Sequence, residues 1–174
     1  MTLDEYERFG QKIYADLAEF IAKALSDALD PQRQSVIRLQ HVKTRPKGLT
    51  SLREKLEKNG VALDEPRIEE NIKDLAGCRL VFYTNTDVNR LAGSGLINDL
   101  FEIDWERTKL HYPTEQSDSD FRSDNIVVRL KESHLAMPGC ERFRGLACEI
   151  QVQTALNHAW AEMEHVIYKI RRLP

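Results

Sequence analysis

An unbroken apolar run, Leu80 to Tyr83 in the segment CRLVFYT, constrains the fold of this chain more than any other feature of the sequence. Consecutive apolar residues in an extended strand place apolar side chains on both faces of a sheet. Both faces then need a cover, and the segments around the run have the helical periodicity that can supply one. The run therefore predicts a buried strand in a sheet flanked by helices.

Helical and strand patterns alternate along the rest of the chain. Apolar residues three and four positions apart predict a long helix over residues 3–29, and the remaining helices are predicted over 51–60, 65–74, 87–101 and 155–169. Alternating or continuous apolar residues predict strands over 35–47, 78–84, 102–110, 125–130 and 147–153. This order favours a single α+β domain over residues 1–174, in which helices flank a mixed sheet of about five strands.

Several residues mark where these elements begin or end. Ser51 followed by Glu54 has the spacing of a capping box, Asp87 is placed to cap the next long helix, and Thr154 is placed to cap the last one. Pro46 lacks a backbone N–H, so the first strand is expected at an edge of the sheet or at the point where the chain leaves it.

Composition excludes several classes of protein. The chain has 174 residues, 41% of them hydrophobic, and a net charge of −3, which is ordinary for a soluble domain and gives no sign of nucleic-acid binding. No apolar run approaches the roughly 18 residues of a membrane span. Three cysteines without a CxxC spacing are expected to be free thiols in a reducing cytoplasm. The final helical pattern continues up to the last residues, so we expect a fragment of a longer chain.

The segment RPKGLTSLREK places cations where a strand ends and a helix begins. Arg45 and Lys47 point toward the helix N-terminus, whose free N–H groups and dipole favour anions, and Lys55 lies one turn further along. This arrangement predicts a polyphosphate site. Spacing alone favours the alternative, a solvated basic strand end before an ordinary capped helix, because capping boxes are common.

Two carboxylates stand at positions suited to metal binding or proton transfer. Asp74 ends a helix just before the buried strand, and Glu149 shares one face of CEIQVQT with Gln151 and Gln153. Carboxylate oxygens are suitable Mg²⁺ ligands, and a carboxylate can also accept a proton from a hydroxyl group. The structural alternatives are that Asp74 caps a turn and pairs with Arg79, and that the strand merely has a polar outer face.

A third group lies on the last helix. His158, Glu162 and His165 are spaced to share one helical face and could ligate a metal ion, although they lack the HExxH order. The alternative is that they flank an apolar stripe that packs in the core. That stripe comprises Leu156, Ala159, Trp160, Met163 and Ile167.

In their order, these blocks resemble the synthetase domain of RelA/SpoT-like alarmone synthetases. The segments RPKGLTSLREK, DLAGCRLVFY, FRSDNIVVRL and CEIQVQTALNHAWAEMEH are similar to that family's RxKxxxSxxxK, DxxGxR, YxSxH and ExQxRT motifs, the last followed by HxWAExEH. The resemblance covers residues 35–169. It implies a nucleotidyltransferase-like fold and transfer of pyrophosphate from ATP to the 3′-hydroxyl of GDP or GTP, with Mg²⁺ as the cofactor.

The resemblance also implies a role for each matching residue. ATP and its phosphates would be held by a group of polar and basic side chains: Arg45, Lys47, Ser51, Lys55 and Arg79. Asp74 and Glu149 would bind Mg²⁺, Glu149 would activate the 3′-hydroxyl, and Gln151 would support the site. Phe121 and Ser123 would belong to the loop that contacts the acceptor base.

The departures from the family pattern lie on the acceptor side. Phe121 replaces a tyrosine, Asp120 a glycine, Asn125 a histidine and Gln153 an arginine. Phenylalanine keeps the aromatic face, so stacking on a base can survive. We therefore expect ATP donation to be retained, with a guanine nucleotide, an adenine nucleotide or the tRNA 3′ end as the acceptor. The acidic loop EQSDSDF argues weakly against tRNA.

Two further hypotheses follow. The altered acceptor loop is compatible with a degenerate module that binds a nucleotide without turnover, whereas the intact Asp74 and Glu149 favour an enzyme. Alternatively, the chain is the catalytic head of a longer protein, and the missing part regulates it or forms a homo-oligomer interface.

Overall fold

Strand β2 (Ala76–Phe82) contains most of the apolar run and lies inside a five-stranded sheet. The structure is a computed structural model that describes residues 1–30, 36–110 and 123–170, apart from the side chains of residues 164–170. Leu80, Val81 and Phe82 have no exposed surface, so the predicted buried strand is confirmed. Tyr83 is 57% exposed because the chain has left the sheet at that point.

The sheet is mixed, with the strand order β1-β2-β5-β4-β3. Strand β2 pairs in parallel with β5 (Cys148–Thr154), and β5 pairs antiparallel with β4 (Asp124–Leu130). The edges are β1 (Leu39–Pro46), antiparallel to β2, and β3 (Phe101–Ile103), antiparallel to β4. The α+β class and the mixed sheet are confirmed. Pro46 lies on an edge strand, as its missing N–H requires.

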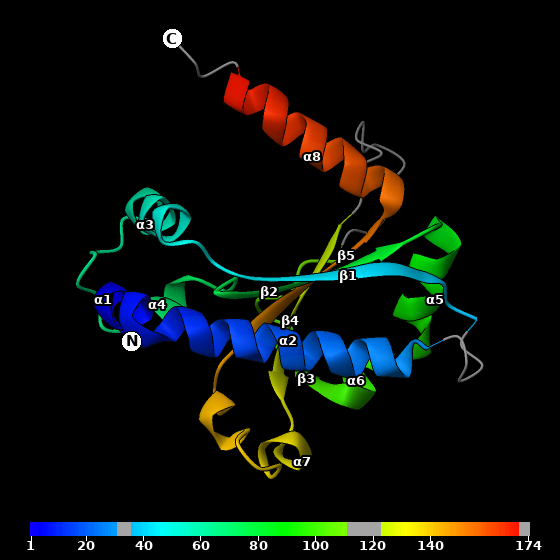
Figure 1. The fold of residues 1–174 in the computed structure, drawn as a ribbon, viewed down its shortest axis with the longest axis horizontal. Helices are drawn as coiled ribbons and strands as arrows, with labels where there is room; N and C mark the ends of the chain where they lie inside the picture. The colour runs from blue at the N-terminus through cyan, green and yellow to red at the C-terminus, as the bar shows by residue number, and fades with distance from the viewer. Residues whose placement is uncertain (31–35, 111–122, 171–174) are drawn as a thin grey trace.

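One face of the sheet is covered by the N-terminal helical segment. It consists of α1 (Leu3–Glu5), the π-helical turn η1 (Tyr6–Gly10) and α2 (Gln11–Ala28), in place of the single predicted helix. Helix α2 packs along β1, β2 and β5 (Figure 1). Its buried stripe, which includes Leu17 and Ile21, contacts the apolar side of the sheet and forms the core. The opposite face of these strands is left for polar side chains.

Shorter elements surround the sheet. They are α3 (Leu49–Lys58), α4 (Ile68–Asn71), α5 (Asn85–Ser94), α6 (Leu96–Leu100), α7 (Glu132–Leu135), the 3-10 turn η3 (Glu141–Phe143) and α8 (Ala155–Ile170). The predicted helix over 65–74 is thus shorter. The predicted strand over 102–110 is reduced to β3 and an isolated bridge between Lys109 and Asn125.

Two predicted caps are wrong. Helix α3 begins at Leu49 after Gly48, without a side-chain cap, so Ser51 lies inside its first turn. Helix α5 is capped by Thr84, whose Oγ1 accepts a hydrogen bond from the backbone N–H of Asp87. The Thr154 cap is confirmed, since its Oγ1 accepts from the N–H of Asn157 at 3.2 Å.

The apolar stripe of α8 does not pack in the core, which contradicts the prediction from its periodicity. Leu156, Trp160 and Met163 are 79%, 59% and 51% exposed. Helix α8 extends away from the sheet beyond its first turns, so the stripe leaves the body of the domain (Figure 1). The side chain of Ile167 lies outside the described residues.

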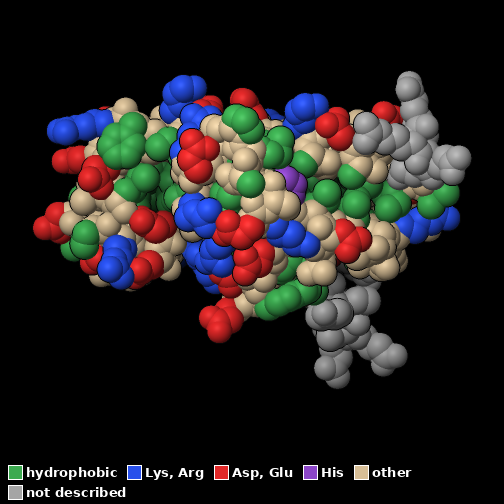
Figure 2. Space-filling model, turned by 90° about the horizontal axis from the view of Figure 1, so that it is seen from below, with side chains coloured by type: hydrophobic (Ala, Val, Ile, Leu, Met, Phe, Trp, Pro, Cys, Tyr) green, Lys and Arg blue, Asp and Glu red, His purple; other side chains and the backbone are tan. Residues whose placement is uncertain are grey.

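The charged surface and the cysteines agree with what the composition predicts. In the view from below, acidic and basic side chains are intermixed across the surface (Figure 2). Cys78, Cys140 and Cys148 are free and buried, as expected. No helix within the described residues is long and apolar enough to cross a membrane.

Candidate functional site

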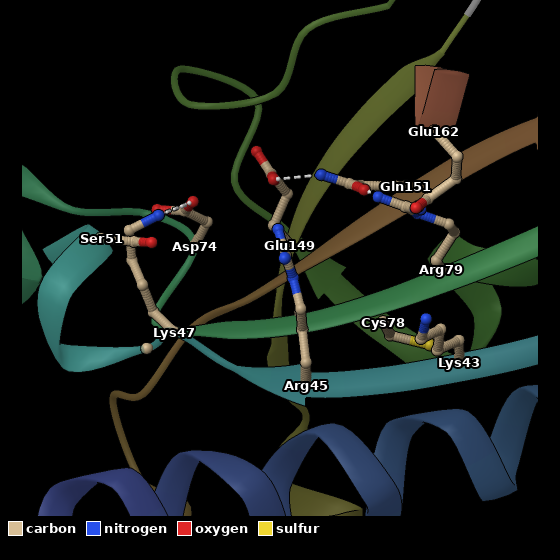
Figure 3. Close-up of a pocket in the computed structure, with 12 residues that line it drawn as sticks. Lys43, Arg45, Lys47, Ser51, Asp74, Cys78, Arg79, Glu149, Gln151 and Glu162 are labelled. Atoms are coloured by element: carbon tan, nitrogen blue, oxygen red, sulfur yellow. Dashed lines mark hydrogen bonds and ion pairs between the residues drawn. The ribbon is translucent and has the colours of Figure 1, made fainter. Parts of the chain in front are cut away.

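A polar cavity lies on the face of the sheet opposite α2. Strands β1, β2 and β5 form its floor, and the start of α3 and one side chain of α8 form its walls (Figure 3). The cavity is lined by Lys43, Arg45, Lys47, Gly48, Ser51, Asp74, Gly77, Cys78, Arg79, Glu149, Gln151 and Glu162. Most of the residues that the sequence singled out for phosphate, metal and proton transfer therefore share one site.

The strand register explains why these side chains meet. Lys43 lies opposite Arg79, and Arg79 lies opposite Gln151, so one row across three strands carries two cations and an amide. The next row towards the start of β2 runs from Arg45 through Gly77 to Glu149. A Cβ at Gly77 would lie 3.4 Å from the Arg45 carbonyl oxygen. Glycine thus leaves space between the cation and the carboxylate.

Asp74 is held by two lysines at one end of the cavity. Lys47 Nζ donates to Oδ2 at 2.6 Å, and Lys55 Nζ donates to Oδ1 at 2.8 Å. Burial opposes ionisation of Asp74, but these two cations outweigh it and hold its pKa below the usual value. Tyr6 O–H donates to the carbonyl oxygen of Lys47 at 2.7 Å, which ties β1 to the N-terminal segment.

Glu149 is nearly buried and both of its carboxylate oxygens are engaged. Lys73 Nζ lies 3.1 Å from Oε1, and Gln151 Nε2 donates to Oε2 at 3.0 Å. Arg79 Nε donates to Gln151 Oε1 at 3.1 Å. That bond fixes the orientation of the amide, because the oxygen must face Arg79 and the NH₂ group must face Glu149. Arg79 therefore helps to position Glu149.

Arg79 is itself held by α8. Its Nη1 donates to Glu162 Oε1 at 3.1 Å and lies 3.2 Å from His158 Nδ1. The hydrogen bond from Arg79 lowers the pKa of Glu162, while burial and then the Arg79 charge lower the pKa of His158. Neutral His158 can accept at Nδ1, and Gln153 Nε2 lies 3.4 Å from the same nitrogen.

Two interpretations of the sequence are corrected by these contacts. Arg79 pairs with Glu162, whereas Asp74 pairs with lysines, so the suggested Asp74–Arg79 pair is wrong. His158 and Glu162 contact the Arg79 guanidinium rather than a metal ion. Within the described ranges, no three His, Cys, Asp or Glu side chains are placed to hold a metal ion together. The side chain of His165 lies outside the described residues.

Asp74 and Glu149 nevertheless have the chemistry to hold Mg²⁺, provided that the phosphates of a nucleotide supply further ligands. Mg²⁺ in phosphate-transfer sites commonly takes one or two protein carboxylates, with phosphate and water oxygens supplying the rest. Both carboxylates line the same cavity, and both are held by cations that a metal ion could replace.

Other predicted residues lie at the margin or outside the cavity. Lys55 contacts Asp74 from the second turn of α3. Ser123 does not line the cavity. Its Oγ donates to Asn125 Oδ1 at 3.3 Å, and Asn125 is paired with Gln151 across β4 and β5. Phe121 lies outside the described residues.

Three charged residues in or beside the cavity were not assigned to it from the sequence. Lys43 could have been found, since it alternates with Arg45 on one face of β1, just before Lys47. Glu162 was assigned to a metal-binding face, and Lys73 gave no signal because its position depends on the turn between α4 and β2.

A family profile described as a region found in RelA/SpoT proteins matches residues 44–172. The chain belongs to the RelA/SpoT family. Among proteins similar to this RelA/SpoT chain, the GTP pyrophosphokinase YwaC of Bacillus subtilis (strain 168) is 23% identical over 130 residues. That match includes 75% of the chain and 58% of YwaC, so the chain spans less than two thirds of this relative.

Solved structures share the fold. Small alarmone synthetase 1 from Bacillus subtilis superposes on the RelA/SpoT chain with a TM-score of 0.74 and 22% identity, covering 97% of the chain and 81% of the synthetase. The same synthetase bound to its product pppGpp gives a TM-score of 0.73 at 24% identity, covering 95% and 82%. The same synthetase bound to AMPCPP gives a TM-score of 0.69 at 21% identity, covering 98% of the chain and 82% of the synthetase. The fold is therefore that of the small alarmone synthetases.

Proposed function

We propose that this chain transfers pyrophosphate from ATP to the 3′-hydroxyl of GDP or GTP and so makes (p)ppGpp-type alarmones. The observation that carries the proposal is that a basic wall and two carboxylates line one cavity in a member of the RelA/SpoT family. The names of the relatives point the same way, since one is a GTP pyrophosphokinase and another binds pppGpp.

The triphosphate of ATP is assigned to the basic side of the cavity, to which β1, β2 and the start of α3 contribute. Arg45, Lys47 and Arg79 supply positive charge, and Lys55 adds a further cation beside Asp74. Helix α3 begins at Leu49, and the free N–H groups of its first turn and the positive end of its dipole lie at the cavity, which Gly48 and Ser51 line. Ser51 in its first turn adds a hydroxyl donor. These charges neutralise the phosphates and hold them for attack.

Glu149 is assigned as the proton acceptor. The 3′-oxygen of the acceptor attacks the β-phosphorus of ATP, and the bond from that phosphorus to the oxygen bridging to the α-phosphate breaks. AMP leaves with that electron pair, and Glu149 takes the hydroxyl proton. Gln151, held by Arg79, keeps the carboxylate oriented.

Asp74 and Glu149 are assigned to hold Mg²⁺ together with the phosphates. When bound, the ion neutralises the charge that develops on the phosphate oxygens. Lys47 and Lys55 now pair with the carboxylate of Asp74, and they would be free to contact the phosphates if Asp74 held the ion instead.

The proposal is tested by transfer of label from [γ-³²P]ATP with Mg²⁺ to GDP, GTP, ATP or tRNA, each in a separate reaction. We expect a labelled product with GDP or GTP and one AMP released per transfer. Transfer only to ATP or tRNA would replace the guanine acceptor with one of those alternatives. Nucleotide binding without transfer to any acceptor would refute the enzyme and favour a binding module.

A further inference from the structure

Lys73 is a cation beside Glu149 that approaches from outside the cavity. Its Nζ lies 3.1 Å from Glu149 Oε1, the carboxylate side chain is 6% exposed, and the lysine side chain is 23% exposed. The same Nζ donates to the carbonyl oxygen of Arg107 at 3.4 Å. Lys73 is absent from the described cavity lining, so the ATP-binding wall proposed above does not use it.

The position of Lys73 has an electrostatic reason. An ionised carboxylate with so little exposure is costly to bury without a countercharge, and Lys73 is the cation within ion-pair distance of Glu149 among the described residues. Lys73 directly precedes Asp74 in the chain. One short segment before β2 therefore supplies one proposed metal ligand and the countercharge of the other.

We propose that Lys73 acts as a tethered cation that competes with the metal ion for Glu149. The inference rests on the proposed function, because that function assigns Glu149 to Mg²⁺. A divalent cation that reaches Glu149 must displace the ammonium group or bind against its charge. The phosphates of a nucleotide change this balance, because they attract the metal ion and add negative charge to the cavity. Metal therefore binds tightly together with the nucleotide and weakly without it.

The inference is tested by binding of Mn²⁺ alone, measured as loss of the free-ion electron paramagnetic resonance signal without nucleotide. Lys73→Met removes the charge and keeps an unbranched side chain, and Lys73→Arg keeps the charge. We expect Lys73→Met to bind Mn²⁺ between about 5-fold and 150-fold more tightly, as for a coupling of ordinary size. Lys73→Arg should bind like the unmodified protein.

A Glu149→Gln background supplies the matched control. Lys73→Met should produce no gain in that background, because the shared carboxylate is absent. Equal or weaker Mn²⁺ binding by Lys73→Met in the Glu149 background would overturn the inference, as would an equal gain in both backgrounds.

A second measurement uses the unmodified chain and so does not depend on the folding of a variant. By linkage, a metal ion on Glu149 must loosen Lys73 to the same extent. Acetylation of Lys73 by an amine reagent, followed by mass spectrometry, should become faster as Mn²⁺ is added, whereas Lys12, 81% exposed on α2, should react at a constant rate. An unchanged rate at Lys73 would overturn the inference. Neither measurement requires pyrophosphate transfer, so failure of the proposed function would be seen separately in the labelled-ATP reaction.

Discussion

Replacing Glu149 with glutamine separates catalysis from stability, because the two side chains have nearly the same shape. At 3.1 Å from Lys73, the charge pair is worth about 5 kcal/mol for an effective dielectric constant of about 20. Removing a carboxylate from water costs several kcal/mol and offsets most of this gain. In Glu149→Gln, the Lys73 ammonium group loses its ion pair but keeps its contact with the Arg107 carbonyl oxygen. It is also partly exposed, so water can contact it.

We therefore expect Glu149→Gln to lower the free energy of unfolding by only about 1–2 kcal/mol, a decrease in Tm of about 2–8 °C for a domain of this size. Loss of the proton acceptor should lower kcat for pyrophosphate transfer by about 10²–10⁴-fold, or about 3–5 kcal/mol in the barrier. The effect on the rate thus exceeds the effect on stability.

The assay measures label transfer from [γ-³²P]ATP to GTP over a range of both substrates, with thermal unfolding followed by circular dichroism. Glu102→Gln, on an exposed position of β3, is the matched control and should leave both kcat and Tm nearly unchanged. Transfer by Glu149→Gln at a rate close to that of the unmodified protein would refute the assignment of Glu149. A fall in rate explained by unfolding at the assay temperature would refute the energetic reasoning.

Three further predictions concern the lysine–carboxylate cluster, the arginine clamp and a helix break. The lowered pKa of Asp74 means that its ion pairs stabilise the fold fully above its usual pKa, near 3.8, and that this stabilisation is lost as pH falls through the lower folded value. In urea unfolding, the free energy of unfolding of Asp74→Asn should therefore fall less steeply in acid than that of the unmodified protein. Parallel plots of the free energy of unfolding against pH would contradict this. Arg79→Lys cannot contact the Gln151 amide and α8 with one planar group, so kcat/KM for ATP should fall by about tenfold, while an unchanged value would exclude the clamp. Gly95 has a φ of +72° between α5 and α6, so Gly95→Ala should destabilise the fold by about 1 kcal/mol. Gly93→Ala, inside α5, should stabilise it by about 0.5–1 kcal/mol. Both free energies are measured by urea unfolding, and equal effects would contradict the backbone argument.

Local pattern predicted most of the fold. The apolar run at Leu80–Phe82 requires cover on both faces, and alternation in β5 assigns Glu149 and Gln151 to one face, because both follow from the two-residue period of a strand. The prediction was wrong where the backbone does not follow the local capping pattern. Ser51 has the spacing of a capping residue, but α3 begins two residues earlier, after Gly48.

The α+β class, the polar face of β5 and the ordered motifs of the RelA/SpoT family can be predicted from the residues alone, since these features depend on neighbours in the chain or on motif order. The charge partners, in contrast, become visible only in the folded chain. Lys73 faces Glu149, two lysines face Asp74, and Arg79 is clamped by α8. The two residues of each pair are 19 to 83 positions apart in the chain, and no local periodicity encodes such separations. Tertiary packing also decided that the apolar stripe of α8 leaves the core, because a helix buries its stripe only where another element lies against it.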